Sequence, residues 1–412
     1  MTENDRMISV DEAIRIILSE VKPTPEESAP ILDSVGRVLS RDIVSDVNIP
    51  PTDNSAMDGY ALKHESTRSA TGNSPAELVV CGEIRAGSVY SGPDVAEGFA
   101  VRIMTGAPIP DGADAVVPVE DTLEAQGKVR VLCEFQSGEN IRRAGEDIAA
   151  GMTVLSAGHR IRPADIGLLA SLNRIEAPVR RRPVVAIIAT GDELVDPGEE
   201  IGPGQIRNSN AYALYAEILK YGAIPRYLGI ARDTMQDTFE KFKQAFEADI
   251  VITTGGVSMG KYDFVKDVMR DIGVGISVRK ILMKPGKPLV FGAKDGKLCF
   301  GLPGNPVSSL VSFLQFVRPA ILKSMGARSI DKPVVNAVLL EDIRKKPERR
   351  HFIRGFFSIR NGELVVSTTG PQGSGILMSM SQANCLIILK EGVSLLRAGD
   401  RVPVQLINHE EI

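Results

Sequence analysis

Cysteine and histidine are both scarce in this chain of 412 residues, which has four of each. The cysteines lie far apart and the histidines show no ligand spacing, which argues against a structural zinc site. We expect the four thiols to be reduced and buried, as is usual in a cytoplasmic protein. These four are Cys81, Cys133, Cys299 and Cys385. The scarcity of cysteine and histidine does not exclude a site in which carboxylates hold a hard metal ion.

Long apolar runs and an excess of positive charge are also missing. No apolar run reaches the roughly 18 residues that a transmembrane helix needs, and the polar, acidic start (residues 1–6) is unlike a secretory signal. The formal net charge is −4, whereas nucleic-acid binders usually carry a basic excess on one face. We therefore expect a cytoplasmic protein of two to four domains that binds neither membranes nor nucleic acid.

The first regular element predicted is a helix. Ser9 is a good N-cap, and Glu12 three residues later completes a capping box. The apolar residues that follow share one helical face, and prolines at 23 and 25 end the pattern. This face consists of Val10, Ala13, Ile14, Ile17, Leu18 and Val21. The stripe predicts that the helix packs on a core.

Three stretches with different patterns follow this helix. In residues 26–175, short apolar runs between Gly, Pro and Asp predict small sheets without long helices. From Arg180 onward, apolar strands alternate with helical patterns, which predicts a doubly wound α/β domain. From Lys332 to the end, alternating runs predict a compact β-barrel or a β-sandwich, two folds that the pattern does not separate.

Glycine-rich polar loops follow three of the predicted strands of the α/β domain, at residues 190–193, 254–258 and 301–306. Ligands bind outside the carboxyl ends of strands in such sheets, and adjacent glycines let backbone N–H groups approach an anion. Tight turns without a ligand are the alternative, but three such loops at one sheet edge favour a binding site. Gly255, Gly256 and Ser258 form the main predicted binding turn.

The same glycine turn also resembles a nucleotide-binding P-loop, but the sequence argues against that interpretation. From Gly255 onward the chain resembles a phosphate-binding P-loop that is one residue short. Tyr262 stands where that loop needs a hydroxyl side chain to hold Mg²⁺. We therefore expect an anion-binding turn and not a nucleotide-binding P-loop.

Charged residues of both signs flank these loops. Glu193, Asp233 and Asp263 follow or flank strand ends, where carboxylates can hold a Mg²⁺ ion against substrate phosphates, although Asp233 could equally cap a helix. Three lysines lie in a segment stiffened by two prolines, which favours an oxyanion site over solvated side chains. They are Lys280, Lys284 and Lys287.

Two polar segments stand out in the β-rich stretch. Residues 53–61 contain many hydrogen-bonding side chains among small residues, and residues 140–148 couple paired cations to paired acids. Each segment is either functional or a structural turn held by local salt bridges.

Seven motifs, in order along nearly the whole chain, resemble the molybdopterin molybdotransferase family, which includes the bacterial MoeA-type proteins and the gephyrin E domain. Each motif is weak alone, but seven in register are specific. They occupy residues 53–61, 102–108, 141–148, 190–194, 255–258, 284–288 and 301–308.

The resemblance implies four domains and a homodimer whose active site is shared between protomers. It makes residues 1–25 with 178–328 an α/β molybdopterin-binding domain on which the N-terminal helix packs. Residues 26–47 with 147–177 would form a linker and dimerisation domain, and residues 48–146 a β-rich domain. Residues 329–412 would form a C-terminal β-barrel.

The implied activity is molybdenum insertion. The enzyme would bind adenylylated molybdopterin and molybdate, cleave the adenylate with a divalent metal (usually Mg²⁺), insert molybdenum into the dithiolene and release AMP. Other proteins of molybdenum cofactor biosynthesis would be its partners. Two alternatives are a molybdopterin adenylyltransferase, which shares the α/β domain but is usually short, and a gephyrin-like scaffold without catalysis.

The resemblance also assigns roles to individual residues. The catalytic positions would be Asp58, Thr105, Asp147, Glu193, Asp233 and Asp263, of which the last three would hold the metal. Pterin, phosphate or molybdate would contact Gly255, Gly256, Ser258, Lys280, Lys284, Lys287, Ser308, Arg354 and Ser374; cations and hydroxyls suit a tetrahedral dianion. Gly375 stands where many relatives have histidine, so the details of the molybdate pocket can differ here.

Overall fold

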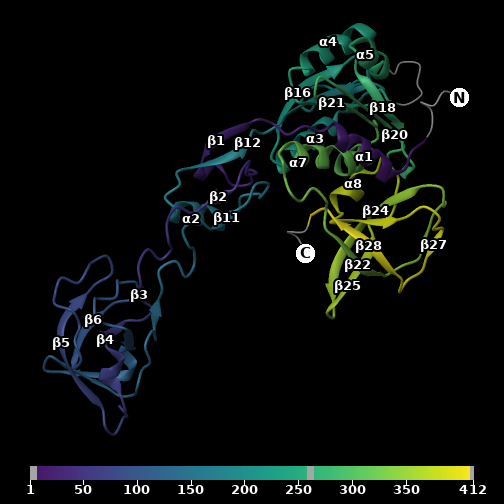
Figure 1. Ribbon diagram of the computed structural model, residues 1–412. Coiled ribbons are helices and arrows are strands. Elements are labelled where there is room, and N and C mark those ends of the chain that lie inside the picture. Colours follow the sequence, from purple (N-terminus) through teal and green to yellow (C-terminus); the bar gives the residue numbers. More distant parts are fainter. Residues whose placement is uncertain (1–6, 258–263, 409–412) are drawn as a thin grey trace. The chain divides into compact units, whose positions relative to one another are not determined.

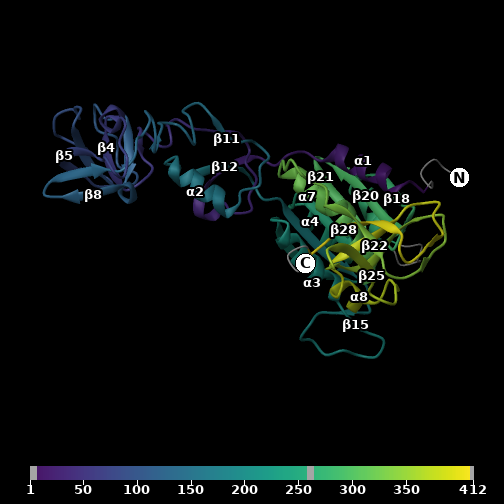
Figure 2. The ribbon, with the colours of Figure 1, turned by 90° about the horizontal axis from the view of Figure 1, so that it is seen from below.

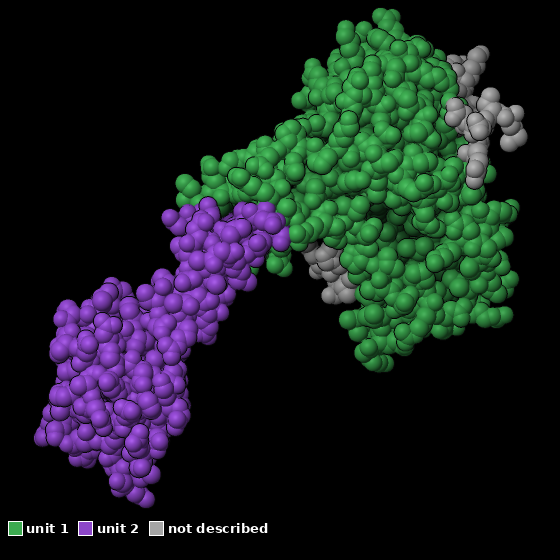
Figure 3. All heavy atoms as spheres, viewed as in Figure 1, with its two compact units in different colours: residues 1–41, 157–167, 175–412 green, residues 42–156, 168–174 purple. Residues whose placement is uncertain are grey.

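The computed structural model describes residues 7–257 and 264–408, which form two compact units (Figure 3). Unit 1 comprises residues 1–41, 157–167 and 175–412, and unit 2 comprises residues 42–156 and 168–174. Each unit has its own sheets and its own hydrophobic clusters. They are therefore described one at a time.

A six-stranded sheet forms the centre of the α/β part of unit 1. Its first four strands are parallel. β20 turns into β21 through a tight hairpin and is therefore antiparallel to it, and β18 is antiparallel to β20. The predicted parallel sheet is thus confirmed with an antiparallel edge. The strand order is β16 (Ile224–Ala231), β13 (Val184–Thr190), β17 (Ile250–Thr254), β21 (Lys297–Leu302), β20 (Pro288–Lys294) and β18 (Gly275–Lys280).

Helices cover both faces of this sheet, as the continuous apolar strands predict. Ile187 and Ile188 are neighbours in β13, yet they belong to separate hydrophobic clusters because successive side chains of a strand point to opposite faces. The helices are α3 (Ser209–Lys220), α4 (Met235–Ala245), α5 (Val265–Asp271), α6 (Pro306–Ser312) and α7 (Arg318–Ser324), with a π-helical turn at Phe313–Val317 between the last two.

The N-terminal helix α1 (Val10–Glu20) lies beside β18 and α7 (Figures 1 and 2). The Ser9 hydroxyl accepts a hydrogen bond from the Glu12 amide at 3.1 Å, so the predicted N-cap is confirmed. The chain before the helix pairs with the lysine segment, because the Ile8 amide donates to the Lys280 carbonyl at 3.2 Å and the Leu282 amide donates to the Ile8 carbonyl at 2.8 Å. The helix therefore braces a predicted part of the site.

An ion pair ties α1 to the C-terminal part of unit 1. The Arg350 guanidinium donates to both carboxylate oxygens of Asp11, at 2.7 and 2.8 Å. Asp11→Asn should lower the free energy of unfolding by about 1 kcal/mol in urea denaturation, because the Asp11 side chain is 72% exposed and exposed pairs contribute little. Glu20→Gln removes the same charge from an exposed position of the same helix and should cause no loss. An equal loss in both variants would show that the pair itself contributes nothing.

Five strands after residue 333 close into a barrel, which decides between the two folds that the sequence left open. The order is β24 (Arg350–Arg360), β25 (Glu363–Thr368), β22 (Val334–Leu339), β28 (Arg401–Leu406) and β26 (Cys385–Leu389). Closure comes from β26, which pairs with β24 as well as with β28. The two-residue strand β19 (Met283–Lys284) pairs with the first two residues of β24, Arg350 and His351, and links the lysine segment to the barrel.

Unit 2 is β-rich, as predicted. Its six-stranded sheet has the order β7 (Ala115–Pro118), β4 (Gly59–Leu62), β6 (Phe99–Ile103), β5 (Ala76–Ile84), β9 (Lys128–Val131) and β8 (Thr122–Ala125). Two small pairs accompany it, β3 (Asn54–Ser55) with β10 (Ile141–Arg142) and β2 (Ile43–Val44) with β11 (Thr153–Leu155).

Two expectations need correction. The helix α2 (Pro163–Ser171) was not predicted in the stretch expected to lack long helices. All four cysteines are free, but only Cys299 and Cys385 are buried, whereas Cys133 is half-buried and Cys81 is exposed. Cys81 lies in an alternating strand whose outward positions meet solvent, so its apolar neighbours in sequence do not cover it.

In the part of the chain that the structure describes, every helix is too short or too polar to cross a membrane.

Candidate functional site

The three glycine-rich loops do lie at one edge of the α/β sheet. They follow β13, β17 and β21, which are parallel neighbours in the sheet, so their carboxyl ends meet. This arrangement confirms the predicted placement of the loops.

The turn after β17 requires glycine at two positions. Gly255 and Gly256 have φ angles of 98° and 65°, and a Cβ atom on Gly255 would lie 2.7 Å from the Thr190 hydroxyl oxygen. The Gly255 N–H donates to the Leu302 carbonyl at 3.0 Å, so it joins two of the loops and is not directed at a ligand. The backbone of this turn is therefore shaped by its packing against the neighbouring loops. Ser258, the other predicted residue of the turn, lies outside the described residues.

Carboxylates gather where β13 and β16 end. The Asp233 amide donates to the Asp192 carboxylate at 3.2 Å and the Asp192 amide donates to the Asp233 carboxylate at 3.4 Å, so the two loops are tied together. Glu193 is exposed, and its carboxylate lies over Gly191. Helix α4 is capped by the Thr234 hydroxyl, which accepts from the Asp237 amide, so the alternative that Asp233 is the N-cap is wrong.

The carboxylates at this edge of the sheet are the kind of ligand that magnesium prefers. Asp192, Glu193 and Asp233 offer only oxygen ligands, and Mg²⁺ is commonly held by one or two carboxylates together with substrate phosphates. Within residues 7–257 and 264–408, three or more potential ligands do not come together in one cluster. Asp263, the third predicted metal ligand, lies outside those residues. The described carboxylates therefore suit a metal that the substrate helps to bind.

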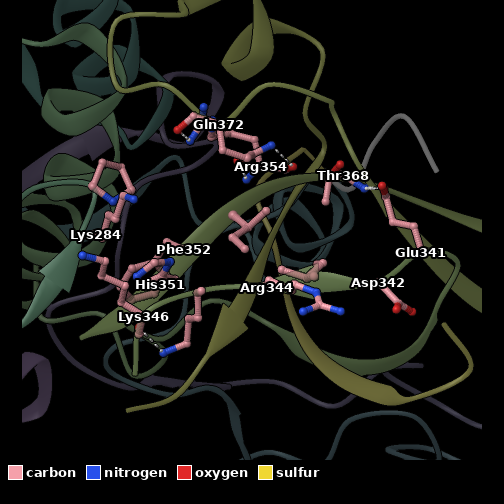
Figure 4. A pocket seen from close by; sticks show the side chains of 14 residues that line it. Lys284, Glu341, Asp342, Arg344, Lys346, His351, Phe352, Arg354, Thr368 and Gln372 are labelled. Atoms are coloured by element: carbon pink, nitrogen blue, oxygen red, sulfur yellow. Dashed lines mark hydrogen bonds between the residues drawn. The ribbon is translucent and has the colours of Figure 1, made fainter. Parts of the chain in front are cut away.

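A pocket of about 540 Å³ lies where the lysine segment meets the barrel (Figure 4). Lys284 and Pro285 supply one side, and residues of β24 and of the loops around residues 341–346 and 368–372 supply the rest. Its lining holds five cationic side chains and two carboxylates, so it favours an anion. The cations are Lys284, Arg344, Lys345, Lys346 and Arg354, and the acids are Glu341 and Asp342.

Arg354 is the most deeply placed of these cations, with 1% of its surface exposed. Its guanidinium donates to the carbonyls of residues 371–373 at 3.0–3.4 Å and to the Ser379 hydroxyl at 3.1 Å. Burial lowers the pKa of Arg354 to about 10, so the group stays charged at neutral pH. Arg354 therefore shapes the loop that leads to Ser374, whose carbonyl accepts from the Val307 amide at the start of α6.

His351 lies beside Lys284 in the same pocket and is neutral at neutral pH (Figure 4). Burial, together with the positive charges of Lys345, Lys284 and Arg349, lowers the pKa of His351 to about 4. The imidazole therefore adds no charge to the pocket under physiological conditions.

The lowered pKa of His351 predicts a dependence of stability on pH. An unfolded histidine titrates near 6.5, so between pH 6.5 and 4 the unfolded chain holds a proton that the folded chain does not. Stability contributed by His351 is complete above pH 6.5 and falls toward pH 4, by at most about 1.4 kcal/mol per pH unit. Urea denaturation of His351→Asn should show a shallower loss over this window. The same slope in both proteins would contradict the prediction.

The remaining predicted residues of unit 1 are spread over the same region. Lys280 ends β18, and Lys287 is exposed three residues beyond Lys284. Ser308 lies inside α6 with 4% of its surface exposed, away from the lining of the cationic pocket. Ser374 follows the loop held by Arg354. The structure thus brings Lys284 and Arg354 into one pocket and places the carboxylates at the strand ends.

The predicted residues of unit 2 lie on exposed loops. The Asp58 carboxylate accepts from the Thr105 amide and hydroxyl, both at 2.7 Å, and these hydrogen bonds lower the pKa of Asp58. Asp147 is also exposed, and its amide donates to the Ile49 carbonyl. The two polar segments are joined to each other, because β3 pairs with β10 and Arg143 forms an ion pair with Asp53.

Comparison with known proteins covers the whole chain. Family models match the MoeA N-terminal region (domain I and II) at residues 8–173, a probable molybdopterin binding domain at 186–323 and the MoeA C-terminal region (domain IV) at 336–407. The molybdopterin molybdenumtransferase of Bacillus subtilis is 37% identical over 100% of this chain and 96% of its own, and that of Haemophilus influenzae is 36% identical over 98% and 99%. The chain belongs to the molybdopterin molybdenumtransferase family.

Solved structures agree with this membership. The molybdopterin biosynthesis moeA protein from Pyrococcus horikoshii OT3 is 33% identical, with a TM-score of 0.86 over 98% of this chain and 100% of that chain. A structure of a molybdopterin biosynthesis moea protein from Pyrococcus horikosii is 30% identical, with a TM-score of 0.83 over 97% of this chain and 99% of that chain. The α/β, barrel and β-rich parts described above are therefore those of a MoeA-type transferase.

Several residues of the candidate site were not predicted from sequence. Asp192 lies between two residues of a recognised motif, and Arg344, Lys345 and His351 line the cationic pocket. The basic runs at residues 344–346 and 349–350 were a usable signal for the pocket. They were missed because the surrounding pattern reads as an ordinary turn between strands of the barrel.

Proposed function

We propose that this protein transfers molybdenum to molybdopterin and so takes part in molybdenum cofactor biosynthesis. The observation that carries the proposal is the cationic pocket between Lys284 and the barrel, in a chain that matches molybdopterin molybdenumtransferases over its full length. Molybdate is a dianion, and charge-assisted hydrogen bonds from lysine and arginine are the strongest that a protein offers it.

In the finer version of the proposal, the substrate is adenylylated molybdopterin and AMP is released. Glu193, Asp233 and Asp263 would hold Mg²⁺, which neutralises phosphate charge when it is bound. The glycine turn at residues 255–258 would hold the pterin phosphate, and Lys280, Lys284 and Lys287 with Ser374 would orient molybdate. Arg354 would act by fixing the loop before Ser374, as its hydrogen bonds to residues 371–373 support.

We further propose a homodimer, divided into the four domains that the resemblance implies, in which Asp58, Thr105 and Asp147 complete the site of a second copy. Their exposed position on loops of unit 2 supports this, because exposed carboxylates are available to a partner. Purified heterodimers of Asp58→Ala and Lys284→Met protomers should regain about a quarter to a half of wild-type activity. Heterodimers as inactive as either parent would contradict a shared site.

Two experiments separate the proposal from its alternatives. With molybdopterin, ATP and Mg²⁺ but no other protein, wild type should form no adenylylated molybdopterin; its formation would make the protein an adenylyltransferase. In cells that lack their own molybdenumtransferase, wild type should restore molybdoenzyme activity and Lys284→Met should not. Equal restoration by both would favour a scaffold.

A further inference from the structure

Asn210 lies between two of the loops at the carboxyl edge of the sheet. It belongs to the first turn of α3, and its side-chain amide donates to the Thr254 hydroxyl at 2.8 Å and to the Gly304 carbonyl at 2.7 Å. Thr254 is the last residue before the glycine turn, and Gly304 lies within the loop after β21. One side chain therefore contacts both loops directly.

The orientation of this amide is set by its partners. The Gly304 carbonyl can only accept, so the nitrogen of Asn210 must face it, and the same nitrogen reaches Thr254 with its second hydrogen. The Asn210 amide oxygen is buried and has no hydrogen-bond partner among the residues that the structure describes. An aspartate at this position would place an oxygen against the Gly304 carbonyl, so only a side chain with two donors on one atom keeps both contacts.

The helix that carries Asn210 is itself fixed. Asn208, the N-cap of α3, donates to Asp196 at 2.9 Å and to the Tyr227 hydroxyl at 2.8 Å, which ties the start of the helix to β16. Asn208 is 1% exposed. The amide of Asn210 is thus held by a rigid element, which is what precise placement of a binding loop requires.

The two loops also touch each other at this point. The Gly255 amide donates to the Leu302 carbonyl at 3.0 Å, and a Cβ on Gly304 would lie 3.7 Å from the Gly255 Cα. The two loops are therefore close together, and Asn210 of α3 adds hydrogen bonds to both of them.

We propose that Asn210 is a positioning residue of the site, whose amide holds the glycine turn and the loop at Gly304 at the spacing that binds molybdopterin. This inference rests on the proposed function, because it names the pterin substrate as the ligand of these loops. Asn210 acts through Thr254 and Gly304 and need not touch the substrate itself. Its loss should weaken substrate binding while the chemistry at saturating substrate continues.

The test is binding of purified molybdopterin to the full-length protein, followed by the fluorescence of the pterin, together with the transfer rate at saturation. Asn210→Asp keeps the shape and loses both donors, so the dissociation constant should rise about tenfold, as expected for one or two lost hydrogen bonds, while the saturated rate falls less than twofold. Binding by Asn210→Asp equal to that of wild type would overturn the inference.

Two further sets of variants separate positioning from general stability. Thr254→Val removes the acceptor and should weaken binding several-fold, whereas Thr254→Ser keeps it and should bind like wild type; equal binding by both would contradict the proposal, even if Asn210→Asp does not fold. Asn384→Asp makes the same substitution at a buried asparagine of the barrel, whose side chain bonds only the backbone of Phe357 among the described residues, and should lower stability without changing the dissociation constant. A rise equal to that of Asn210→Asp would reduce Asn210 to a structural role.

The outcome for wild type distinguishes this inference from the function on which it rests. If wild type binds no molybdopterin, the proposed function fails and the inference falls with it. If wild type binds and only the Asn210 and Thr254 predictions fail, the function stands and the inference alone is overturned.

Discussion

Replacing Lys284 by methionine is expected to reduce molybdenum transfer about 100-fold while leaving the fold intact. The side chain is exposed in β19 and lines the cationic pocket, so its removal leaves no buried group without a partner. A charge-assisted hydrogen bond to a bound oxyanion contributes up to about 3 kcal/mol, and each 1.4 kcal/mol corresponds to a tenfold change in rate.

Two control variants test whether the charge of Lys284 and its position in the pocket matter. Lys284→Arg keeps the charge and should retain intermediate activity, because a guanidinium is larger and differently shaped than an ammonium. Lys243→Met removes a lysine from an exposed position of α4, outside the pocket, and should leave the rate unchanged. Activity of Lys284→Met within threefold of wild type, measured at saturating molybdate, would remove this residue from the site.

Replacing Arg354 by methionine is expected to lower the free energy of unfolding by about 3 kcal/mol and to weaken molybdate binding. The buried guanidinium supplies donors to three carbonyls of residues 371–373 and to the Ser379 hydroxyl, and hydrogen bonds from a charged group contribute about 1.5–3 kcal/mol each. The cost of burying the charge offsets part of this sum, so the net loss is close to that of one or two such bonds.

The control for Arg354 is Arg360→Met, at the exposed end of the same strand, which should change stability by less than about 0.5 kcal/mol. Arg354→Lys should not rescue the loop, because an ammonium cannot reach four acceptors that are arranged around a planar guanidinium. Urea denaturation measures the change in stability, and titration of the folded protein with molybdate measures the change in binding. A variant as stable as wild type would show that the loop holds itself without Arg354.

Features governed by local chemistry could be predicted from the sequence. The Ser9 cap depends only on residues of its own helical turn. The run at residues 184–189 is apolar throughout because helices cover both faces of its sheet. The meeting of three glycine loops also followed, since the carboxyl ends of neighbouring parallel strands share an edge. The alternating pattern from Lys332 onward likewise predicted that the last part of the chain is built of strands.

Features that depend on distant pairings could not be predicted. Whether the last domain is a barrel depends on the pairing of β26 with β24, and alternation within a strand does not reveal its neighbours. The cationic pocket combines Lys284 with residues more than 50 positions later, because β19 pairs with the start of β24. Arg354 was expected to contact molybdate, and nothing in its own sequence context showed that its donors are taken up by residues 371–373.

The most direct test of the account is the molybdenum content of the pterin product. Wild-type protein is incubated with adenylylated molybdopterin, molybdate and Mg²⁺, the pterin is extracted, and its molybdenum is quantified by mass spectrometry against Lys284→Met under the same conditions. About one molybdenum per pterin is expected with wild type and a small fraction of that with the variant, and only the wild-type product should reconstitute a molybdenum-free enzyme. A pterin free of molybdenum after incubation with active, folded wild type would contradict the account.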